Sequence, residues 1–266
     1  MTSKTMAPVL KSAEELKIMR EAGRIVAIAH EEMRRAIEPG VSTKALDDIA
    51  NAVLRDHGAS PCFLGYAPGN HPPFPATITA SVNKELVHGI PSKERILQDG
   101  DVIGVDVACF YRGYVGDAAY SHAVGKVSRS ALRLLEAADA ALEAAINASV
   151  LGNKISDVAK ATARYAGRMG YSVAREYTGH GVGKSMHEEP QVPNWWPGKN
   201  SKIQWQDYDL QAGMTYAIEP MLIAGRGDLM ELEDGWTVVT KDGSLTAHCE
   251  HTVAITEDGP LILTLP

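Results

Sequence analysis

Four carboxylates of this chain lie in segments that are otherwise apolar and strand-like. Asp106 lies in DVIGVDVA, Glu219 in TYAIEPMLI and Glu250 in AHCEHTVAI, and Asp117 follows Asp106 by eleven residues. A buried carboxylate without a partner is costly, so each of these acids requires a cation, a hydrogen bond or a proton. One such acid alone is more typical of a solvated or paired carboxylate, whereas four in separate apolar strands predict a shared metal ion.

The first two acids are predicted to face the same way. The dipeptide RG predicts a hairpin turn in which Tyr111 faces Tyr114. That register pairs Asp106 with residue 119 and makes Asp117 its diagonal neighbour on one sheet face. Two carboxylates at about 7–8 Å between Cα atoms repel each other unless a cation lies between them. The spacing therefore predicts a divalent cation, with a buried salt bridge as the alternative.

Three histidines accompany the acids. His180 lies between Gly179 and Gly181, so the backbone around it leaves room for a metal ion or a substrate. His187 follows seven residues later, and His88 precedes the segment GIP. A carboxylate-rich set suits Mg²⁺, Mn²⁺ or Fe²⁺, and one imidazole widens the choice to Co²⁺ and Zn²⁺. A lone histidine in a loop is more often structural, but the cluster favours a functional site.

The elements that would position these residues can be predicted from the hydrophobic pattern. Apolar residues that recur every three or four positions predict four amphipathic helices, over 13–37, between Ser42 and Gly58, and over 128–150 and 156–169. Strands are predicted near 76–82 and 102–108. Residues 65–76 contain four prolines and two glycines and are predicted to form an irregular surface loop. Function often resides in such loops.

The chain also contains an internal repeat. Two pairs of glycines with the same separation bracket two of the predicted helices: Gly40 and Gly58, then Gly152 and Gly170. A Leu-Gln pair precedes Asp106 by nine residues, and a second pair precedes Glu219 by the same distance. We therefore predict an α+β fold with a tail over 1–12 and a single catalytic domain over 13–266, whose related halves, about 13–125 and 126–266, hold the site between them.

The composition excludes several classes of protein. The chain has 266 residues, of which 45% are hydrophobic and 22% charged, and this excludes disordered and fibrous proteins. Acidic residues outnumber basic ones by 33 to 26. The sequence therefore lacks the excess of basic residues that is typical of proteins that bind nucleic acids or anionic membranes. The sequence shows neither the apolar run of a membrane span nor the pattern of a signal peptide, and we therefore predict a cytoplasmic location. Three cysteines without Cys-x-x-Cys spacing are predicted to be free packing residues.

Several motifs together resemble a type I methionine aminopeptidase over nearly the whole chain. They are GHGVGKSMHEEP, the spacing between Asp106 and Asp117, GMTYAIEPM, EHTVAIT and SVNKELVHGIPS. The resemblance implies the pita-bread fold, with two pseudo-symmetric halves around a central antiparallel sheet. It also implies a monomer that removes the N-terminal methionine from nascent proteins and peptides when the second residue is small, with transient association with the ribosome. The alternatives are an Xaa-Pro aminopeptidase, whose family shares the motif around His180, and a non-catalytic binding protein on this fold.

The resemblance also implies roles for individual residues. It makes Asp106 a chelator of one metal ion and His180 and Glu219 ligands of a second, with Asp117 and Glu250 bridging the two. Glu219 would also shuttle a proton during attack by a metal-activated water. His187 would bind the carbonyl oxygen of the substrate as it becomes an oxyanion, and His88 the scissile nitrogen. The cofactor would be two divalent ions per chain, chosen from Co, Mn, Fe, Zn and Ni.

A methionine pocket is implied as well, lined by apolar and aromatic side chains. The matching positions are Phe63, Tyr66, Phe74, Thr79, Met186 and Trp236. The loop that carries Tyr66 and Phe74 is longer than the family pattern, and four residues depart from it near the metal site: Ala108, Ala118, Ala119 and His248. His248 precedes Glu250 by two residues, so a regular strand would put both on one face.

Overall fold

The computed structural model describes residues 7–198 and 201–266. Its four helices are α1 (Ala13–Ala36), α2 (Thr43–Asp56), α3 (Arg129–Ala148) and α4 (Ile155–Arg168). Its strands are β1 (Ser60–Pro61), β2 (Ile78–Val82), β3 (Glu85–Val87), β4 (Val102–Tyr111), β5 (Tyr114–Ala123), β6 (Ser172–Val173), β7 (Thr178–Gly181), β8 (Glu188–Pro193), β9 (Thr215–Ile218), β10 (Met221–Ile223), β11 (Leu229–Glu231), β12 (Val238–Thr240), β13 (Thr246–His248), β14 (Glu250–Thr256) and β15 (Gly259–Ile262).

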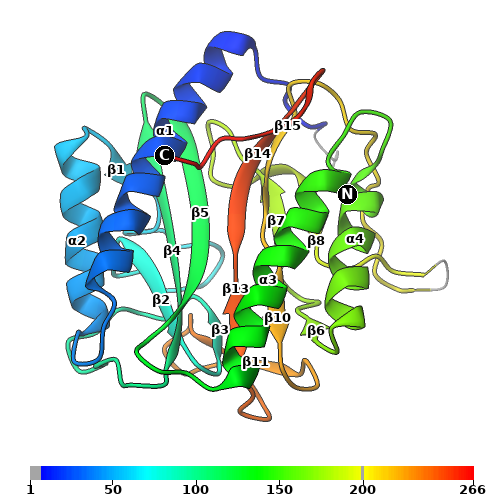
Figure 1. The fold of residues 1–266 in the computed structure, drawn as a ribbon. Helices are drawn as coiled ribbons and strands as arrows, with labels where there is room; N and C mark the ends of the chain where they lie inside the picture. The colour runs from blue at the N-terminus through cyan, green and yellow to red at the C-terminus, as the bar shows by residue number, and fades with distance from the viewer. Residues whose placement is uncertain (1–6, 199–200) are drawn as a thin grey trace.

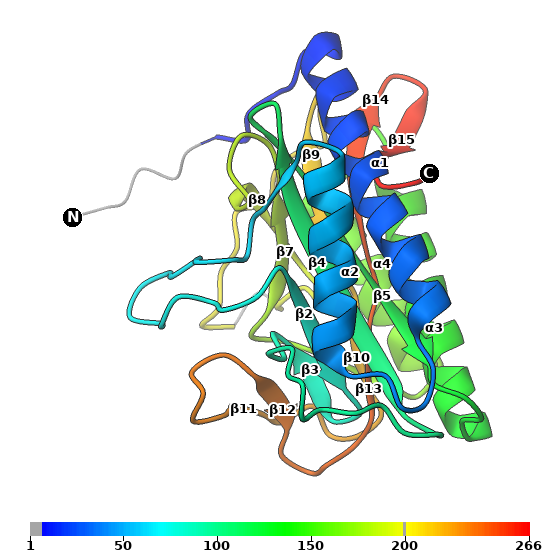
Figure 2. The same cartoon turned by 90° about the vertical axis from the view of Figure 1, so that its left-hand side faces the viewer.

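A curved antiparallel sheet forms the centre of the molecule. It has nine strands in the order β1-β4-β5-β14-β9-β7-β8, with β2 paired to β4 and β15 paired to β14. Two smaller sheets, β13-β10-β6 and β11-β12-β3, lie at one end (Figure 1). The helices cover one side of the central sheet, and β11, β12 and the loop between β1 and β2 project from the other side (Figure 2). This arrangement is the predicted α+β pita-bread fold.

The four predicted helices are confirmed to within two residues at each end. Serine side chains cap three of them: Ser12 accepts a hydrogen bond from Glu15 N, Ser42 from Ala45 N and Ser128 from Ala131 N. Such caps satisfy amide groups that the first helical turn leaves without partners. No described helix combines the length and the apolarity that crossing a membrane takes.

The hairpin register that was predicted around Asp106 is confirmed. Tyr111 pairs with Tyr114, and Asp106 pairs with Ala119. The predicted strand through Glu219 is interrupted instead, because β9 ends at Ile218 and β10 starts at Met221 in a different sheet. Pro220 follows Glu219 and has no amide hydrogen to give to a ladder, so the chain changes sheets at this point.

Matched contacts recur in the two halves of the chain. Ser42, which precedes α2, forms an isolated β-bridge with Ile96, and Lys154, which precedes α4, forms one with Asp209. Each helix pair also packs on its own hydrophobic core. Leu46 of α2 belongs to one core, and Leu134 of α3 belongs to the other. These correspondences support two related halves. Residues 1–6 of the predicted tail lie outside the described residues, and Lys11 within it contacts the domain through a hydrogen bond from its amide to Gly213 O.

The strand that carries Asp117 packs very closely on α1. A Cβ atom at Gly116 would lie 2.5 Å from the carbonyl carbon of Ala22 and 2.6 Å from the amide nitrogen of Gly23. Both neighbours belong to the backbone of α1, which cannot move away without shifting the whole helix.

Gly116→Ala should therefore lower the free energy of unfolding by about 1–3 kcal/mol, the usual cost of overpacking a core. Chemical denaturation monitored by circular dichroism would measure this change. Gly167→Ala is the matched control, because this exposed helical glycine of α4 has no atom near its Cβ position. The control should be neutral or slightly stabilising, since alanine favours helix over glycine. Equal effects of the two substitutions would contradict the close packing.

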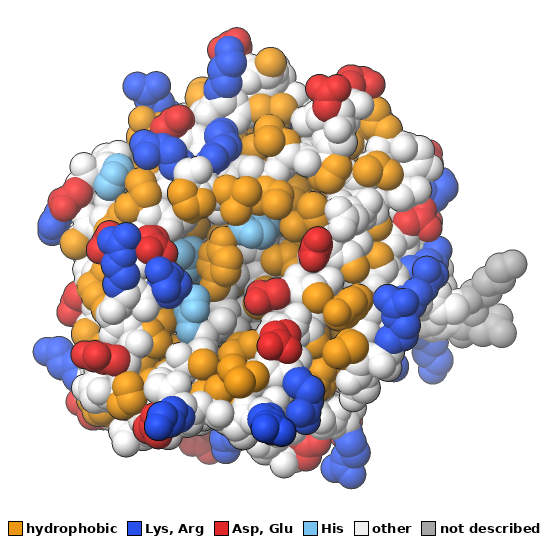
Figure 3. All heavy atoms as spheres, viewed as in Figure 1, with side chains coloured by type: hydrophobic (Ala, Val, Ile, Leu, Met, Phe, Trp, Pro, Cys, Tyr) orange, Lys and Arg blue, Asp and Glu red, His pale blue; other side chains and the backbone are white. Residues whose placement is uncertain are grey.

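The helix-covered face has a hollow between α1 and α3, and imidazoles gather around it (Figure 3). A cavity of about 180 Å³ is lined there by His30, His122, Tyr120, Arg34 and Pro266, among others. The Nε2 atom of His30 lies 2.7 Å from Ala118 O. Burial lowers the pKa of His30 to about 3, so this imidazole is neutral and donates that hydrogen bond. The three cysteines, Cys62, Cys109 and Cys249, are free and buried, as predicted.

Candidate metal centre

The predicted ligands lie on the face of the central sheet that the helices leave open. Ala119 of β5 has Asp106 opposite it on β4 and Glu250 opposite it on β14. Thr79 of β2 extends this row beyond Asp106. Asp117 lies two residues before Ala119 and so projects from the same face of β5. Because the side chain of Ala119 is only a methyl group, the space between the three carboxylates stays open.

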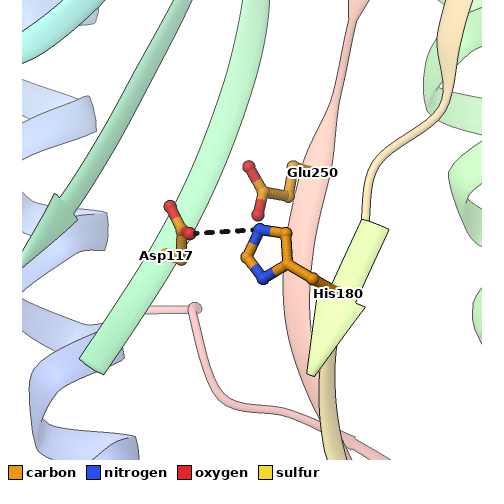
Figure 4. Close-up of side chains that lie close together, drawn as sticks. All are labelled: Asp117, His180 and Glu250. Atoms are coloured by element: carbon orange, nitrogen blue, oxygen red, sulfur yellow. Dashed lines mark ion pairs between the residues drawn. The ribbon is translucent and has the colours of Figure 1, made fainter. Parts of the chain in front are cut away.

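Asp117, Glu250 and His180 form the tightest group. Each offers one ligand atom, and these three atoms lie within 4.8 Å of one another. Figure 4 shows the three side chains converging from β5, β14 and β7. The Nε2 atom of His180 lies 3.9 Å from Asp117 Oδ2 and 3.5 Å from Glu219 Oε1. Glu219 therefore reaches the same group from the break between β9 and β10.

Within the part of the chain that the structure describes, the ion-pair partners of these carboxylates are imidazoles and not lysine or arginine. Asp106 Oδ1, Asp117 Oδ1 and Glu250 Oε1 are buried and have no hydrogen-bond partner. Burial raises the pKa of Asp106, Glu219 and Glu250 well above the usual range, and the neighbouring carboxylates raise each further. Ionised carboxylates only accept, so oxygens left without a donor in this position fit hard or borderline divalent cations. The residues present therefore fit the metal site that the sequence predicts.

The imidazole of His180 is prepared to act as a ligand. Its Nδ1 lies 3.1 Å from Gly181 O, a contact that places the proton on Nδ1 and leaves the lone pair on Nε2. Burial lowers the pKa of His180 to about 3, and His187 lowers it further, so the ring is neutral. Nε2 is the atom that faces Asp117 and Glu219.

The buried acids predict an unusual pH dependence of stability for the metal-free protein. Burial raises the pKa of Asp117 to about 7, above its value of about 3.9 in an unfolded chain. Between these two values the folded state binds more protons, so stability is lost as the pH rises through about 7. One such proton changes the free energy of unfolding by up to about 1.4 kcal/mol per pH unit. The nearby histidines have lowered pKa values, so they lower the stability as the pH falls. This opposite effect occurs mainly below about pH 6.5, the pKa of histidine in an unfolded chain.

Urea denaturation between pH 6.5 and 8 would test this expectation. The metal-free wild type should lose stability across this range, and metal-free Asp117→Asn should lose less. Saturating Mn²⁺ should remove the loss in the wild type, because the cation stabilises the ionised carboxylates. Superimposable curves for the two metal-free proteins would show that Asp117 does not titrate in this window.

His88 and His187 line the same cavity as the carboxylate cluster. His88 follows β3 with a backbone φ of 61°, a conformation that is uncommon outside glycine and typical of functional positions. Its ring packs edge-on against Tyr177 and Trp236, at centroid distances of 5.8 and 6.1 Å. Burial lowers the pKa of His88 to about 4 and also lowers that of His187, so both rings are neutral at pH 7.

All predicted site residues line a single cavity of about 300 Å³. Its lining combines the predicted ligands with the residues of the predicted methionine pocket. Within that pocket Phe74 packs edge-on against Phe63 and Trp236, at centroid distances of 6.4 and 5.2 Å. The result is an apolar chamber directly beside a polar cluster.

Seven further residues line the cavity that the sequence did not single out: Pro68, His71, Val87, Tyr177, Thr178, Met221 and Glu231. Adjacency to a predicted site residue could have indicated Val87, which precedes His88, and Met221, which follows Glu219 and Pro220. Tyr177 and Thr178 lead directly into the GHG motif. No pattern in the sequence marks Glu231, which ends β11, and none distinguishes His71 from the other residues of the predicted loop over 65–76.

The expectation for His248 is wrong in one respect. It ends β13, which pairs with β10, whereas Glu250 begins β14 in the central sheet. Cys249 lies between the two strands, so the regular alternation of side chains is lost. The imidazole nevertheless reaches the metal ligands, since His248 Nε2 lies 3.7 Å from Glu219 Oε2.

Comparison with known proteins agrees with this geometry. The metallopeptidase family M24 matches residues 17–257. Methionine aminopeptidase 1 of Bacillus subtilis is 45% identical over 256 residues, which cover 96% of this chain and 98% of that protein. Because the match extends over both proteins almost completely, it includes all of the segments that form the cavity.

Solved structures show the same fold. A methionine aminopeptidase from Thermotoga maritima superimposes with a TM-score of 0.91 at 36% identity, covering 98% of this chain and 100% of that one. A prolidase from Pyrococcus furiosus gives a TM-score of 0.76 at 21% identity and is covered over only 66% of its length, so it shares the fold alone. The chain belongs to metallopeptidase family M24 and, within it, to the methionine aminopeptidases.

Proposed function

We propose that this protein removes the N-terminal methionine from nascent polypeptides and peptides whose second residue is small. The observation that carries the proposal is the single cavity in which an electron-rich carboxylate cluster adjoins an aromatic chamber. The chamber suits one unbranched apolar side chain, since thioethers pack well against aromatic rings. The preference for a small second residue, the association with the ribosome, the monomeric state and the cytoplasmic location remain predictions.

Five side chains would hold the cofactor: Asp106, Asp117, His180, Glu219 and Glu250. Divalent cations held there would supply Lewis-acid chemistry, polarising the scissile carbonyl and lowering the pKa of water. Two ions per chain are proposed, because four ionised carboxylates carry four negative charges, twice what one divalent cation balances. The identity of the metal follows availability more than geometry in a site of this kind.

The remaining polar residues are proposed to handle the substrate and the protons. His187 is proposed to donate a hydrogen bond to the carbonyl oxygen as negative charge develops on it. His88 is proposed to contact the scissile nitrogen and assist its protonation. Glu219 is proposed to carry a proton during the attack by water.

Peptide hydrolysis would test the proposed specificity against the proline-specific alternative. The metal-loaded protein should release methionine from Met-Ala-Ser with a kcat/KM about 10²-fold or more above that for release of alanine from Ala-Pro peptides. Amino-acid analysis of the products would measure both rates. Release of alanine at the higher rate would support an Xaa-Pro aminopeptidase, and no release from either peptide would support a binding protein.

A further inference from the structure

We propose that Tyr66 is a positioning residue for His187. The Tyr66 hydroxyl donates a hydrogen bond to His187 Nδ1 and so holds the proton of the imidazole on Nε2. The Tyr66 hydroxyl oxygen lies 3.0 Å from His187 Nδ1. The two rings are tilted at 43° with centroids 5.7 Å apart, so the contact is made by the polar atoms. This inference rests on the proposed function only where it concerns how His187 meets the substrate.

The hydrogen bond decides which nitrogen of His187 can donate. A neutral imidazole carries one N–H group, and the other nitrogen is an acceptor. When Nδ1 accepts from Tyr66, the proton must be on Nε2, so Nε2 is the nitrogen left to donate to a substrate in the cavity that His187 lines. The opposite tautomer would present a lone pair to the carbonyl oxygen of a substrate and repel the developing negative charge.

Tyr66 is suited to be the donor in this pair. Burial raises the pKa of its phenol, so the hydroxyl keeps its proton throughout the neutral range. Its ring also packs on Trp236 at a centroid distance of 6.5 Å. A phenol that is always protonated and is held by a neighbouring indole provides a fixed donor.

The base of the loop between β1 and β2 fixes the backbone of Tyr66. Gly65 N donates to Phe74 O at 2.8 Å, and Phe74 N donates to Tyr66 O at 2.8 Å. Tyr66 N donates to Phe63 O at 2.9 Å. These bonds close the loop in the manner of a hairpin, so Tyr66 keeps its place despite the irregular sequence that follows.

The tip of the same loop is attached to the turn that carries Trp236. Trp236 Nε1 donates to Pro72 O at 2.9 Å, and the Nδ1 atom of His71 lies 2.7 Å from Gly235 O. The His71 ring packs on Trp236 at a centroid distance of 5.1 Å. The loop is thus anchored at its base and at its tip, and these anchors bracket Tyr66 in the sequence.

Nitrogen-15 NMR of the protein loaded with diamagnetic Zn²⁺ would test the tautomer without any substrate. In the wild type, His187 Nε2 should show the chemical shift of a protonated nitrogen and Nδ1 that of an acceptor. In Tyr66→Phe, which removes only the hydroxyl, both shifts should move toward an average of the two tautomers. A wild-type His187 with its proton on Nδ1 would overturn the proposal.

Kinetics would separate positioning from a role in the wall of the pocket. Tyr66→Phe should lower kcat on Met-Ala-Ser roughly tenfold and leave KM unchanged. This loss is smaller than that for removal of an oxyanion donor itself, which is about 10²-fold. In a His187→Ala background the same substitution should cost nothing further, because the group that it positions is absent. Asn70→Ala, an exposed change in the same loop, should match the wild type in both measurements.

Two results would contradict the positioning role. One is a Tyr66→Phe enzyme with wild-type kcat and a wild-type pattern of His187 shifts. The other is an equal loss of activity in the wild-type and His187→Ala backgrounds, which would make Tyr66 a contact for substrate. If the shifts change as expected while no methionine is released by any variant, the positioning role stands and the proposed function fails.

Discussion

Asp106→Asn is expected to abolish metal binding and activity together. The Oδ1 atom of its carboxylate is buried and has no hydrogen-bond partner. The amide removes a negative charge and can turn a donor toward the cation, so both the charge and the geometry of the site are lost. Losing the Lewis acid removes several kcal/mol of transition-state stabilisation, a fall in kcat/KM of about 10³-fold or more.

Elemental analysis of the variant, together with kcat/KM on Met-Ala-Ser, would measure both effects. Asp258→Asn is a suitable control, because this exposed carboxylate lies in the turn after β14 and far along the strand from Glu250. The control should keep wild-type metal content and activity. An Asp106→Asn protein with full activity and undiminished metal would show that Asp106 is not a ligand.

His187→Ala and His88→Ala are each expected to lower kcat by about 10²–10⁴ while metal content stays near that of the wild type. The reason is that both imidazoles line the cavity but lie outside the tight group formed by Asp117, His180 and Glu250. Steady-state kinetics and elemental analysis of the same preparations would check the two expectations.

The metal content decides between two roles for these histidines. His187 packs edge-on against His180 with centroids 4.2 Å apart, so proximity alone would also allow it to bind a metal ion. Loss of metal in either variant would make that histidine a ligand. His57→Ala, on the exposed end of α2, should leave both measurements unchanged.

The features that could be predicted from the sequence are those set by local geometry. The turn at Arg112 and Gly113 sets the hairpin register, and the alternation of side chains then puts Asp106 and Asp117 on one face. Helix ends followed from capping serines and glycines close to them in sequence. In each case the determining residues lie within a few positions of the element that they specify.

The features that could not be predicted depend on contacts between distant segments. Glu219 lies in a break between strands because its neighbours pair with two different sheets, and apolar periodicity cannot show which sheet a strand joins. The contact of Tyr66 with His187 joins residues 121 positions apart. It depends on how the long loop packs against Trp236, which sequence spacing does not encode.

We propose that Asp106, Asp117, His180, Glu219 and Glu250 together hold divalent metal ions. Anomalous diffraction from crystals grown with Co²⁺ and measured on both sides of the cobalt absorption edge tests it most directly. We expect two anomalous peaks among these five side chains, one beside His180 Nε2 and Glu219 and the other beside Asp106. Peaks elsewhere, or none in this cavity at saturating Co²⁺, would contradict the claim.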